Sequence, residues 1–269
     1  MIKNIKRFIS FSGGVESTTM CLLYGKGAIA LVADTGDEEE EMYERWKHIE
    51  QMLKVIHDND FEIKYLQGEV LAKGIVCHTL DELAMAWKYF PSPRRRYCTA
   101  RLKIEPIDNF LANQGECELL IGFNADENPG TDREGNWMKC DNVSYRYPLH
   151  EEGYTREDCI ELLIKNGLMP NFPPYMQRGG CRKCPFRTKK EAKAKYFFNR
   201  EGFLQDMEFE KKLQDNRKTF YGINMNFPEG YESVMKECEQ ELSFFGEAEI
   251  KSMYKNIKGH EPCGAFCHR

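Results

Sequence analysis

Short apolar runs alternate with amphipathic patterns through the first half of the chain, and this alternation constrains the fold more than any other feature. The apolar runs, typical of buried strands, cover 8–12, 28–34, 61–66 and 118–123. Helical patterns lie near 15–24, 38–56, 79–88 and 99–113. Strands that alternate with helices predict an α/β fold with an open, mostly parallel, doubly wound sheet of the Rossmann-like kind.

The pattern changes after about residue 150, where charged and mostly helical sequence begins. We therefore expect an α/β domain over 1–150 and a helical C-terminal portion over 151–269. Thr155 and Asp158 are spaced to cap one helix, and Gly167 stands near its expected end. A glycine- and proline-rich loop with a CxxC motif follows.

The overall composition excludes some classes of protein. A formal net charge of −5 argues against a general nucleic-acid binder, although local patches can still be basic. No apolar run approaches the length of a membrane span, and the first residues lack the apolar region of a signal peptide. These features predict a cytoplasmic protein without a membrane partner.

The segment SGGVEST, residues 12–18, follows the first predicted strand and opens the first predicted helix. Backbone N–H groups in a glycine turn at a helix N-terminus can bind an anion, and serine and threonine hydroxyls can add donors. An ordinary capped turn is the alternative. The spacing matches neither a Walker A loop nor the GxGxxG fingerprint.

Two charged stretches lie close to predicted loops. The acidic run 37–41 is most simply explained as the first turn of a helix, where negative charge suits the helix dipole. The basic cluster comprises Arg94, Arg95, Arg96, Arg101 and Lys103. A solvated basic face would explain this cluster, but its position beside a phosphate loop favours contacts with phosphate.

Eleven cysteines without an export signal do not indicate a disulfide framework. Cys21, Cys117 and Cys159 fall in regular apolar patterns and are expected to be small core side chains. Cys181 and Cys184 have the spacing to bind one metal ion or cluster, or to form a redox disulfide. Further candidate ligands are Cys98, His260, Cys263, Cys267 and His268.

Several motifs, in chain order, together resemble those of the PP-loop ATP pyrophosphatases and phosphoadenylylsulfate (PAPS) reductases. They are SGGVES at 12–17, DTG at 34–36, RYCTARLKIEP at 96–106, GFNADEN at 122–128, YPL at 147–149 with YTRED at 154–158, and GCRKCPF at 180–186. The resemblance covers roughly residues 8–190. Many members have Lys-Asp after the two glycines, whereas this chain has Val15-Glu16.

The resemblance implies a site for an adenine nucleotide, either ATP or PAPS, with Mg²⁺ as a possible companion. The implied binding residues are Ser12, Gly13, Gly14, Glu16, Ser17, Thr18, Asp34, Arg101, Lys103 and Asp126. Among them, Asp34 would contact the adenosine part or Mg²⁺. Arg101 and Lys103 would neutralise phosphate or sulfate, with the basic cluster replacing the missing loop lysine.

The resemblance also implies roles for cysteines. In several sulfur-handling members three cysteines hold a [4Fe–4S] cluster, and Cys98, Cys181 and Cys184 fit that arrangement, with Zn²⁺ as the alternative metal. The tail Glu261-Pro262-Cys263-Gly264 loosely resembles the Glu-Cys-Gly tail of PAPS reductases. Cys263 would then be the nucleophile that attacks the sulfate sulfur.

Two reactions follow from the resemblance. One is sulfonucleotide reduction with a thiol reductant as partner; the other is ATP-dependent adenylation with sulfur transfer to a tRNA or DNA base. The non-enzymatic alternative is a nucleotide- or nucleic-acid-binding module with structural zinc, because fold alone does not fix function.

Overall fold

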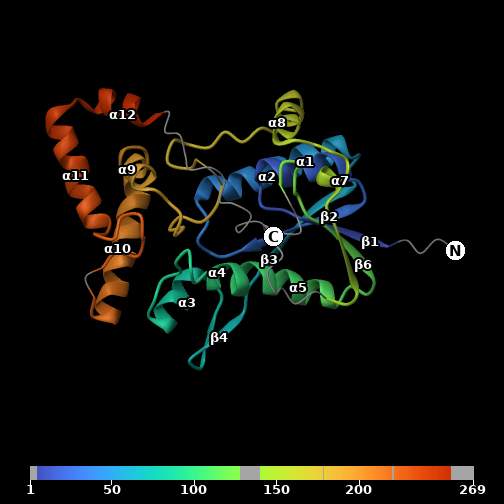
Figure 1. The fold of residues 1–269 in the computed structure, drawn as a ribbon, viewed down its shortest axis with the longest axis horizontal. Helices are drawn as coiled ribbons and strands as arrows, with labels where there is room; N and C mark the ends of the chain where they lie inside the picture. Colours follow the sequence, from blue (N-terminus) through green and yellow to red (C-terminus); the bar gives the residue numbers. More distant parts are fainter. Residues whose placement is uncertain (1–4, 128–139, 178, 220, 256–269) are drawn as a thin grey trace.

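The computed structural model confirms the α/β class; it describes residues 5–127, 140–177, 179–219 and 221–255. Five parallel strands form the main sheet in the order β3-β2-β1-β6-β7 (Figure 1). Their bounds are β1 (Lys6–Ser10), β2 (Ala28–Asp34), β3 (Phe61–Gln67), β6 (Cys117–Leu120) and β7 (Val143–Arg146). The first four confirm the predicted strands with small shifts at their ends, whereas β7 was not predicted.

Side chains of the sheet alternate between its two faces because successive residues of a strand point to opposite sides. On the central strand β1, Ile9 packs under α1 (Val15–Tyr24) and α2 (Glu40–Ile56). Its neighbour Phe8 packs on the other face, against α5 (Glu105–Ala112). The sheet is therefore covered on both sides, as in doubly wound folds.

The strand order places a topological switch at β1, because β2 continues from it in one direction and β6 lies on its other side. Ligands of open α/β sheets bind in the crevice beyond the carboxyl ends of the strands at such a switch. The loop 12–14 leaves β1 at this point, so the fold positions the predicted phosphate loop where a ligand would enter.

The predicted helix near 99–113 is broken into three pieces. These are α4 (Tyr97–Thr99), a π-helical turn η1 (Ala100–Ile104) and α5. A π turn widens the helix locally and is frequent at functional sites. Here it follows Cys98 and contains Lys103, both of which line the pocket described below.

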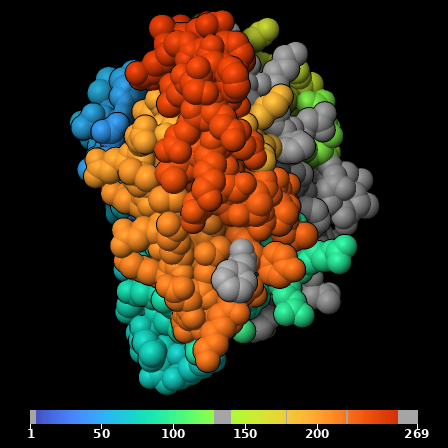
Figure 2. Space-filling view, turned by 90° about the vertical axis from the view of Figure 1, so that its left-hand side faces the viewer, coloured from blue at the N-terminus to red at the C-terminus, as the bar shows by residue number. Residues whose placement is uncertain are grey.

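The C-terminal portion builds a second core. Helices α9 (Lys189–Phe198), α10 (Arg200–Arg217), α11 (Tyr231–Phe244) and α12 (Glu247–Lys255) pack with α3 (Leu80–Trp87) and the hairpin β4 (Val70–Ala72)–β5 (Ile75–Cys77). Phe203, Phe227 and Tyr231 are fully or almost fully buried there. Figure 2 shows the orange and red helices on one face, with the teal segment below them.

Two short helices complete the described elements, α7 (Pro148–Glu151) and α8 (Arg156–Lys165). Helix α8 has the predicted capping box of Thr155 and Asp158. Although the sequence places α8 in the C-terminal portion, its residues Cys159 and Leu163 pack in the core with α1 and α2. None of the described helices is both long and apolar enough to cross a membrane.

Candidate functional site

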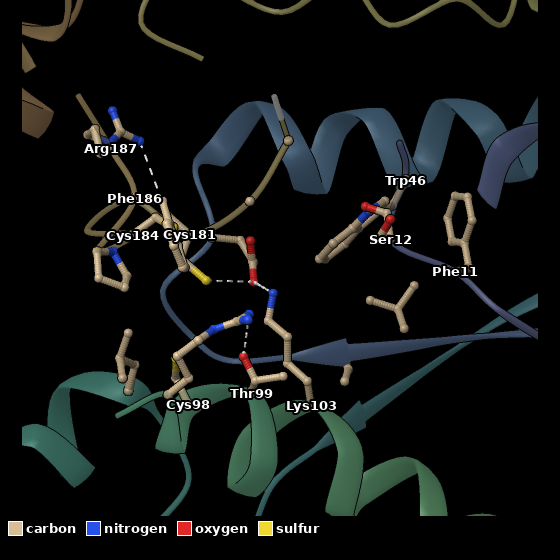
Figure 3. Close-up of a pocket in the computed structure, with 18 of the residues that line it drawn as sticks. Phe11, Ser12, Trp46, Cys98, Thr99, Lys103, Cys181, Cys184, Phe186 and Arg187 are labelled. Atoms are coloured by element: carbon tan, nitrogen blue, oxygen red, sulfur yellow. Dashed lines mark hydrogen bonds and ion pairs between the residues drawn. The ribbon is translucent and has the colours of Figure 1, made fainter. Parts of the chain in front are cut away.

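One pocket brings Ser12 of the predicted phosphate loop and the predicted metal-binding cysteines together, whereas Gly13, Gly14, Ser17 and Thr18 are not among its lining residues (Figure 3). It contains about 1100 Å³ of empty space, part of it open to solvent. Its polar and sulfur-bearing walls include Ser12, Glu38, Arg96, Cys98, Thr99, Lys103, Cys181 and Cys184. Its apolar walls include Phe11, Val32, Leu80, Ile107 and Phe186. An apolar cavity with a few convergent polar groups is typical of a small-molecule site.

The phosphate loop is organised by hydroxyl groups. The Ser12 and Ser17 Oγ atoms lie 3.2 Å apart, and the Gly14 N–H donates to Ser12 Oγ at 3.4 Å. Ser17 Oγ also accepts from the Ser12 N–H at 3.3 Å. Helix α1 begins at Val15, directly after Gly14. The two hydroxyl groups therefore lie at a helix N-terminus, where anions are commonly bound.

Gly13 is required at its position. Its φ of +83° lies in the left-handed region, and a Cβ there would come within 2.8 Å of Trp46 Nε1. Trp46 Nε1 donates to the Ser12 carbonyl at 3.0 Å, which holds the loop against α2. Trp46 was not predicted as a site residue, because a tryptophan in an amphipathic helix indicates only core packing.

Arg45 supports the same loop from α2 and was also missed. Its Nε donates to the Gly13 carbonyl at 2.7 Å, and its guanidinium contacts Thr18 Oγ1 at 3.4 Å. Burial lowers the pKa of Arg45 to about 10, and it forms no ion pair with a described carboxylate. Thr18 is fully buried against this group rather than in the pocket.

Asp34 ends β2 and shapes the DTG turn. Its Oδ1 accepts from the Gly36 N–H and from the Tyr43 hydroxyl, both at 2.8 Å. Gly36 has a φ of +66°, and a Cβ there would lie 2.5 Å from Thr79 Cγ2. Asp34 therefore has a local structural task, and the predicted contact with adenosine or Mg²⁺ stays a prediction.

Glu16 and Asp126 lie together, away from the pocket lining. Glu16 forms an ion pair with Arg156 and accepts from Asn124 Nδ2 at 3.2 Å. Asp126 Oδ2 accepts from the Arg156 N–H at 3.0 Å. These contacts join the phosphate loop, the loop after β6 and the start of α8. In this arrangement both carboxylates connect loops, and their predicted contact with a nucleotide stays a prediction.

The basic cluster divides between the pocket and the surface. Lys103 lines the pocket, with its Nζ 3.7 Å from Glu38 Oε1. Arg96 also lines it, donates to Thr99 Oγ1 at 3.0 Å and stacks on Phe186 at 5.2 Å. Arg101 is not among the lining residues and instead pairs with Glu105 at 2.5 Å on the exposed side.

The three predicted ligand cysteines line this pocket from two elements. Cys98 comes from α4, while Cys181 and Cys184 come from the CxxC loop (Figure 3). Cys181 Sγ lies 3.4 Å from Glu38 Oε1 and 3.6 Å from Thr35 Oγ1. Burial and the Glu38 carboxylate raise the pKa of Cys181 well above its ordinary value, so without a bound cation this group is a thiol.

The donor chemistry of this trio suits iron or zinc, because thiolates are the preferred ligands of both. However, no group of three or more His, Cys, Asp or Glu side chains in the described part of the chain is arranged to hold a metal ion. The three residue types therefore fit a metal cluster, but the three thiol groups would have to move closer together to bind it.

Buried ion pairs hold the CxxC loop. Lys183 is 2% exposed and pairs with Asp37, and with Asp81 at 3.0 Å. Arg187 Nη2 pairs with Glu39 Oε1 at 2.7 Å. Burial raises the pKa of Glu39, but the attraction of Arg187 and Lys195 is larger, and the pKa lies below its ordinary value.

The network continues into the helical portion. Lys195 Nζ contacts Glu39 Oε1 at 2.8 Å and Asp206 Oδ2 at 2.6 Å, and Arg182 contacts Asp206 Oδ1 at 2.9 Å. Glu39, Lys195 and Asp206 are all at most 2% exposed. These contacts connect α9 and α10 to the segment between β2 and α2.

The interpretation of the acidic run is therefore correct only in part. Glu40 and Glu41 do occupy the first turn of α2. Asp37, Glu38 and Glu39 precede the helix and are buried, so for these three the interpretation was wrong. They face the cations and the thiol of the CxxC loop, which follows about 140 residues later. A single sequence has no signal for such a distant pairing.

Cys21, Cys117 and Cys159 are buried core side chains, as predicted. The tail residues His260, Cys263, Cys267 and His268 lie outside the described residues. The chain matches no known protein-family model, and no curated protein shows significant sequence similarity to it.

Proposed function

We propose that this protein is an adenine-nucleotide-dependent enzyme of the PAPS reductase-like PP-loop superfamily that handles sulfur. The observation that carries the proposal is the shared pocket of Ser12, Lys103, Cys98, Cys181 and Cys184. These residues come from separate motifs of the resemblance and are up to about 170 positions apart. The alternative, an ordinary turn that only caps a helix, does not explain why Ser12 shares a cavity with three thiol groups.

Each part of the pocket has a task that its chemistry permits. The Ser12–Ser17 hydroxyl pair and the N-terminus of α1 bind phosphate. Lys103 neutralises charge on the phosphate or sulfate. Arg96 adds a second cation at the pocket wall and takes over from the missing loop lysine. Apolar side chains such as Val32 and Ile107 exclude water, which strengthens these contacts.

Cys98, Cys181 and Cys184 would hold a [4Fe–4S] cluster, with Zn²⁺ as the alternative metal. A bound cluster would supply sulfur chemistry in the same cavity as the nucleotide. The metal cation would also reverse the rise in the pKa of Cys181 and stabilise its thiolate. Glu38 holds Cys181 toward the cavity through the 3.4 Å contact.

Two reactions fit this pocket. In the first, the Cys263 thiolate attacks the sulfur of PAPS and expels adenosine 3′,5′-bisphosphate; a thiol reductant then attacks the Cys263 sulfur, so that sulfite leaves and a disulfide forms. In the second, ATP adenylates an acceptor base and pyrophosphate leaves; sulfide, supplied as a co-substrate, then attacks the activated carbon and AMP leaves. The three-cysteine set in the pocket favours the second reaction, because the first does not need three thiols at the nucleotide.

Turnover assays separate the two reactions. Purified protein is incubated with PAPS and a dithiol, or with ATP, Mg²⁺, sulfide and nucleic-acid acceptors, and the products are quantified. Sulfite from PAPS indicates the first reaction, whereas AMP and pyrophosphate from ATP indicate the second. Tight nucleotide binding without either product would support the binding module and contradict the enzyme.

Metal analysis tests the thiol site independently of activity. Protein purified without oxygen is assayed for iron, acid-labile sulfide and zinc, and its visible spectrum is recorded. We expect cluster stoichiometry that Cys98→Ala and Cys184→Ala both abolish. Cys238→Ala is the matched control, because Cys238 is buried in the second core and does not line the pocket. Zinc alone would favour the structural-zinc module, and no metal would overturn the cluster.

A further inference from the structure

One segment beside the pocket is basic in an acidic protein. Residues 83–104 contain six arginines and lysines and no aspartate or glutamate, whereas the whole chain has a net charge of −5. The stretch WKYFPSPRRRY, residues 87–97, also interleaves aromatic rings with these cations. Such a combination is typical of surfaces that bind single-stranded nucleic acid, where cations contact phosphates and rings stack on bases.

A closed turn presents the two exposed arginines of this segment. The Ser92 N–H donates to the Arg95 carbonyl at 3.2 Å, and the Arg95 N–H donates to the Ser92 carbonyl at 3.0 Å. Pro93 and Arg94 form the tip, and both are exposed, as is Arg95. The turn fixes the backbone before any ligand binds, so little backbone entropy would be lost on binding.

These cations differ from several exposed lysines of the helical portion. Lys88, Arg94 and Arg95 are exposed, and none forms an ion pair with a described carboxylate. By contrast, these exposed lysines pair with glutamates, as Lys212 does with Glu208 at 2.7 Å and Lys236 with Glu232 at 3.2 Å. The charge of the turn is therefore available to an external anion.

Aromatic rings lie beside these charges. Tyr89 and Tyr97 pack edge to face at 5.0 Å, and Trp87 packs against Tyr97 at 4.7 Å. Tyr89 directly follows the exposed Lys88 in the chain. Tyr89 is only partly buried. A partly exposed ring next to a cation in the chain offers the stacking surface that a base uses.

The same segment leads into the pocket. Arg96 follows the turn and lines the pocket wall, and Cys98 lies two residues further on. Three residues of chain span at most about 11 Å, so the Cα atom of the exposed Arg95 lies within that distance of the Cα atom of Cys98. A strand held by Arg94 and Arg95 could place one of its nucleotides at the cavity.

We infer that residues 87–97, which we call the arginine turn, form a docking surface for single-stranded nucleic acid. The inference rests on the proposed function, since it supplies the acceptor of the adenylation reaction. Backbone phosphates contact Lys88, Arg94 and Arg95, and a base stacks on Tyr89. Recognition of this kind depends on charge and stacking, so it tolerates many base sequences.

The test is direct binding by fluorescence anisotropy. The probes are fluorescein-labelled single-stranded DNA and RNA of about 20 nucleotides, longer than a single binding module covers, and the matching duplexes. Titrations are repeated between about 50 and 200 mM salt. The main variant is the triple change Lys88→Gln, Arg94→Gln and Arg95→Gln. The matched control removes the same charge from the helical portion with Lys212→Gln, Lys236→Gln and Lys251→Gln.

For the wild type, we expect the logarithm of the binding constant to fall with the logarithm of salt with a slope of about −2, from three phosphate contacts on a single strand. The triple variant should lose more than about tenfold in affinity at low salt and most of the salt slope. The control should bind within about twofold of the wild type. Tyr89→Leu should lose about tenfold, and Tyr89→Phe should retain affinity.

Several outcomes would overturn the inference. They are absence of binding by the wild type, equal losses in the triple variant and its control, or binding to vesicles with anionic headgroups but not to oligonucleotides. Wild-type turnover keeps the two proposals apart. Oligonucleotide binding without turnover of ATP or PAPS would contradict only the proposed function. Turnover without oligonucleotide binding would contradict only the arginine turn as a docking surface.

Discussion

The two loops that meet in the pocket are held in opposite ways. The phosphate loop is fixed by hydroxyls, backbone groups and two side chains of α2, Arg45 and Trp46. The CxxC loop is fixed by buried charges, with Lys183 and Arg187 paired to acidic residues after β2. In the first arrangement one charged contact, the Glu16–Arg156 pair, spans 140 residues and the contacts named above span at most about 35, whereas in the second the ion pairs of Lys183 and Arg187 join segments about 140 residues apart.

This difference has a physical consequence. Hydrogen bonds between neutral groups each contribute about 0.5–1.5 kcal/mol, so the phosphate loop can lose one contact and persist. A buried charge that loses its partner leaves an uncompensated ion, which costs about 3–5 kcal/mol. We therefore expect substitutions of the buried charges that hold the CxxC loop to lower the free energy of unfolding more than substitutions in the phosphate loop. Gly13 is the exception in the phosphate loop.

The largest effect is expected from Lys195→Met. Lys195 is fully buried and contacts both Glu39 and Asp206, so its removal leaves two buried carboxylates with fewer partners. The free energy of unfolding should fall by about 3–5 kcal/mol, measured by urea denaturation. Lys212→Met is the control, because the exposed pair of Lys212 with Glu208 contributes less than about 1 kcal/mol. Similar losses in both variants would contradict the comparison.

Gly13→Ala tests the exception on the phosphate-loop side. The left-handed φ of Gly13 disfavours any Cβ by about 1–3 kcal/mol, and the added atom would also displace the Trp46 ring. We expect this loss in the free energy of unfolding and a change in tryptophan fluorescence. Gly14→Ala is the matched variant, since Gly14 has a φ of −75° and its Cβ would meet only Ser12 Oγ, at 3.5 Å. If the two variants unfold alike, the conformation assigned to Gly13 is wrong.

Glu210→Gln tests whether backbone N–H groups alone can stabilise a buried carboxylate in the helical portion, since Glu210 forms no ion pair with a described cation. Glu210 is buried and accepts from the backbone N–H groups of Ile223 and Tyr231 at 2.8 and 2.7 Å. The nearby residues Asn224 and Asn226 donate to carbonyls of the CxxC segment. Glutamine can satisfy only one of the two N–H groups, so the free energy of unfolding should fall by about 1–3 kcal/mol.

The Glu210 variant also predicts a pH dependence. Burial raises the pKa of Glu210, although its two backbone N–H bonds lower it in part. The folded state therefore keeps the proton to higher pH than the unfolded chain, whose ordinary value is 4.5. The advantage of the wild type over Glu210→Gln should be greatest below pH 4.5 and fall as pH rises through the folded-state pKa. Urea denaturation across this range measures it, and a constant difference would contradict the raised pKa.

The smallest effect is expected from Ser17→Ala. The substitution removes the contacts of Ser17 Oγ with Ser12 and with the Gly14 carbonyl. The free energy of unfolding should fall by only about 0.5–1.5 kcal/mol, because water can replace part of these contacts. Urea denaturation measures this loss, and isothermal titration with ATP should show weaker binding. A loss as large as that of Lys195→Met would mean that hydroxyls and buried charges hold the two loops equally.

Much of the fold was predictable because it depends on patterns within short windows. Strand β2 and helix α1 begin and end where apolar periodicity places them. The capping box of Thr155 and Asp158 formed as expected. Strand β7 and the β4–β5 hairpin were missed. Both are only a few residues long, too short for periodicity to distinguish them from loops.

The residues of the candidate site were predictable only where they form a motif of neighbouring residues in the sequence. The glycines and hydroxyls of the phosphate loop, and the spacing of Cys181 and Cys184, are of this kind. The sequence by itself determined the parallel sheet, the loop at the switch of strand order and the donor types available to a ligand.

Only the tertiary structure decided which of these groups share a cavity. It directed Lys103 into the pocket and Arg101 to the surface, and it buried Asp37 and Glu39 against the CxxC loop. The reason is that both features depend on how the core of the sheet packs against the core of the helical portion. This packing sets the direction of side chains in the π turn, and it sets which charges meet across about 140 residues. Local periodicity records which face of an element is apolar, but it does not record which distant charge that element will meet.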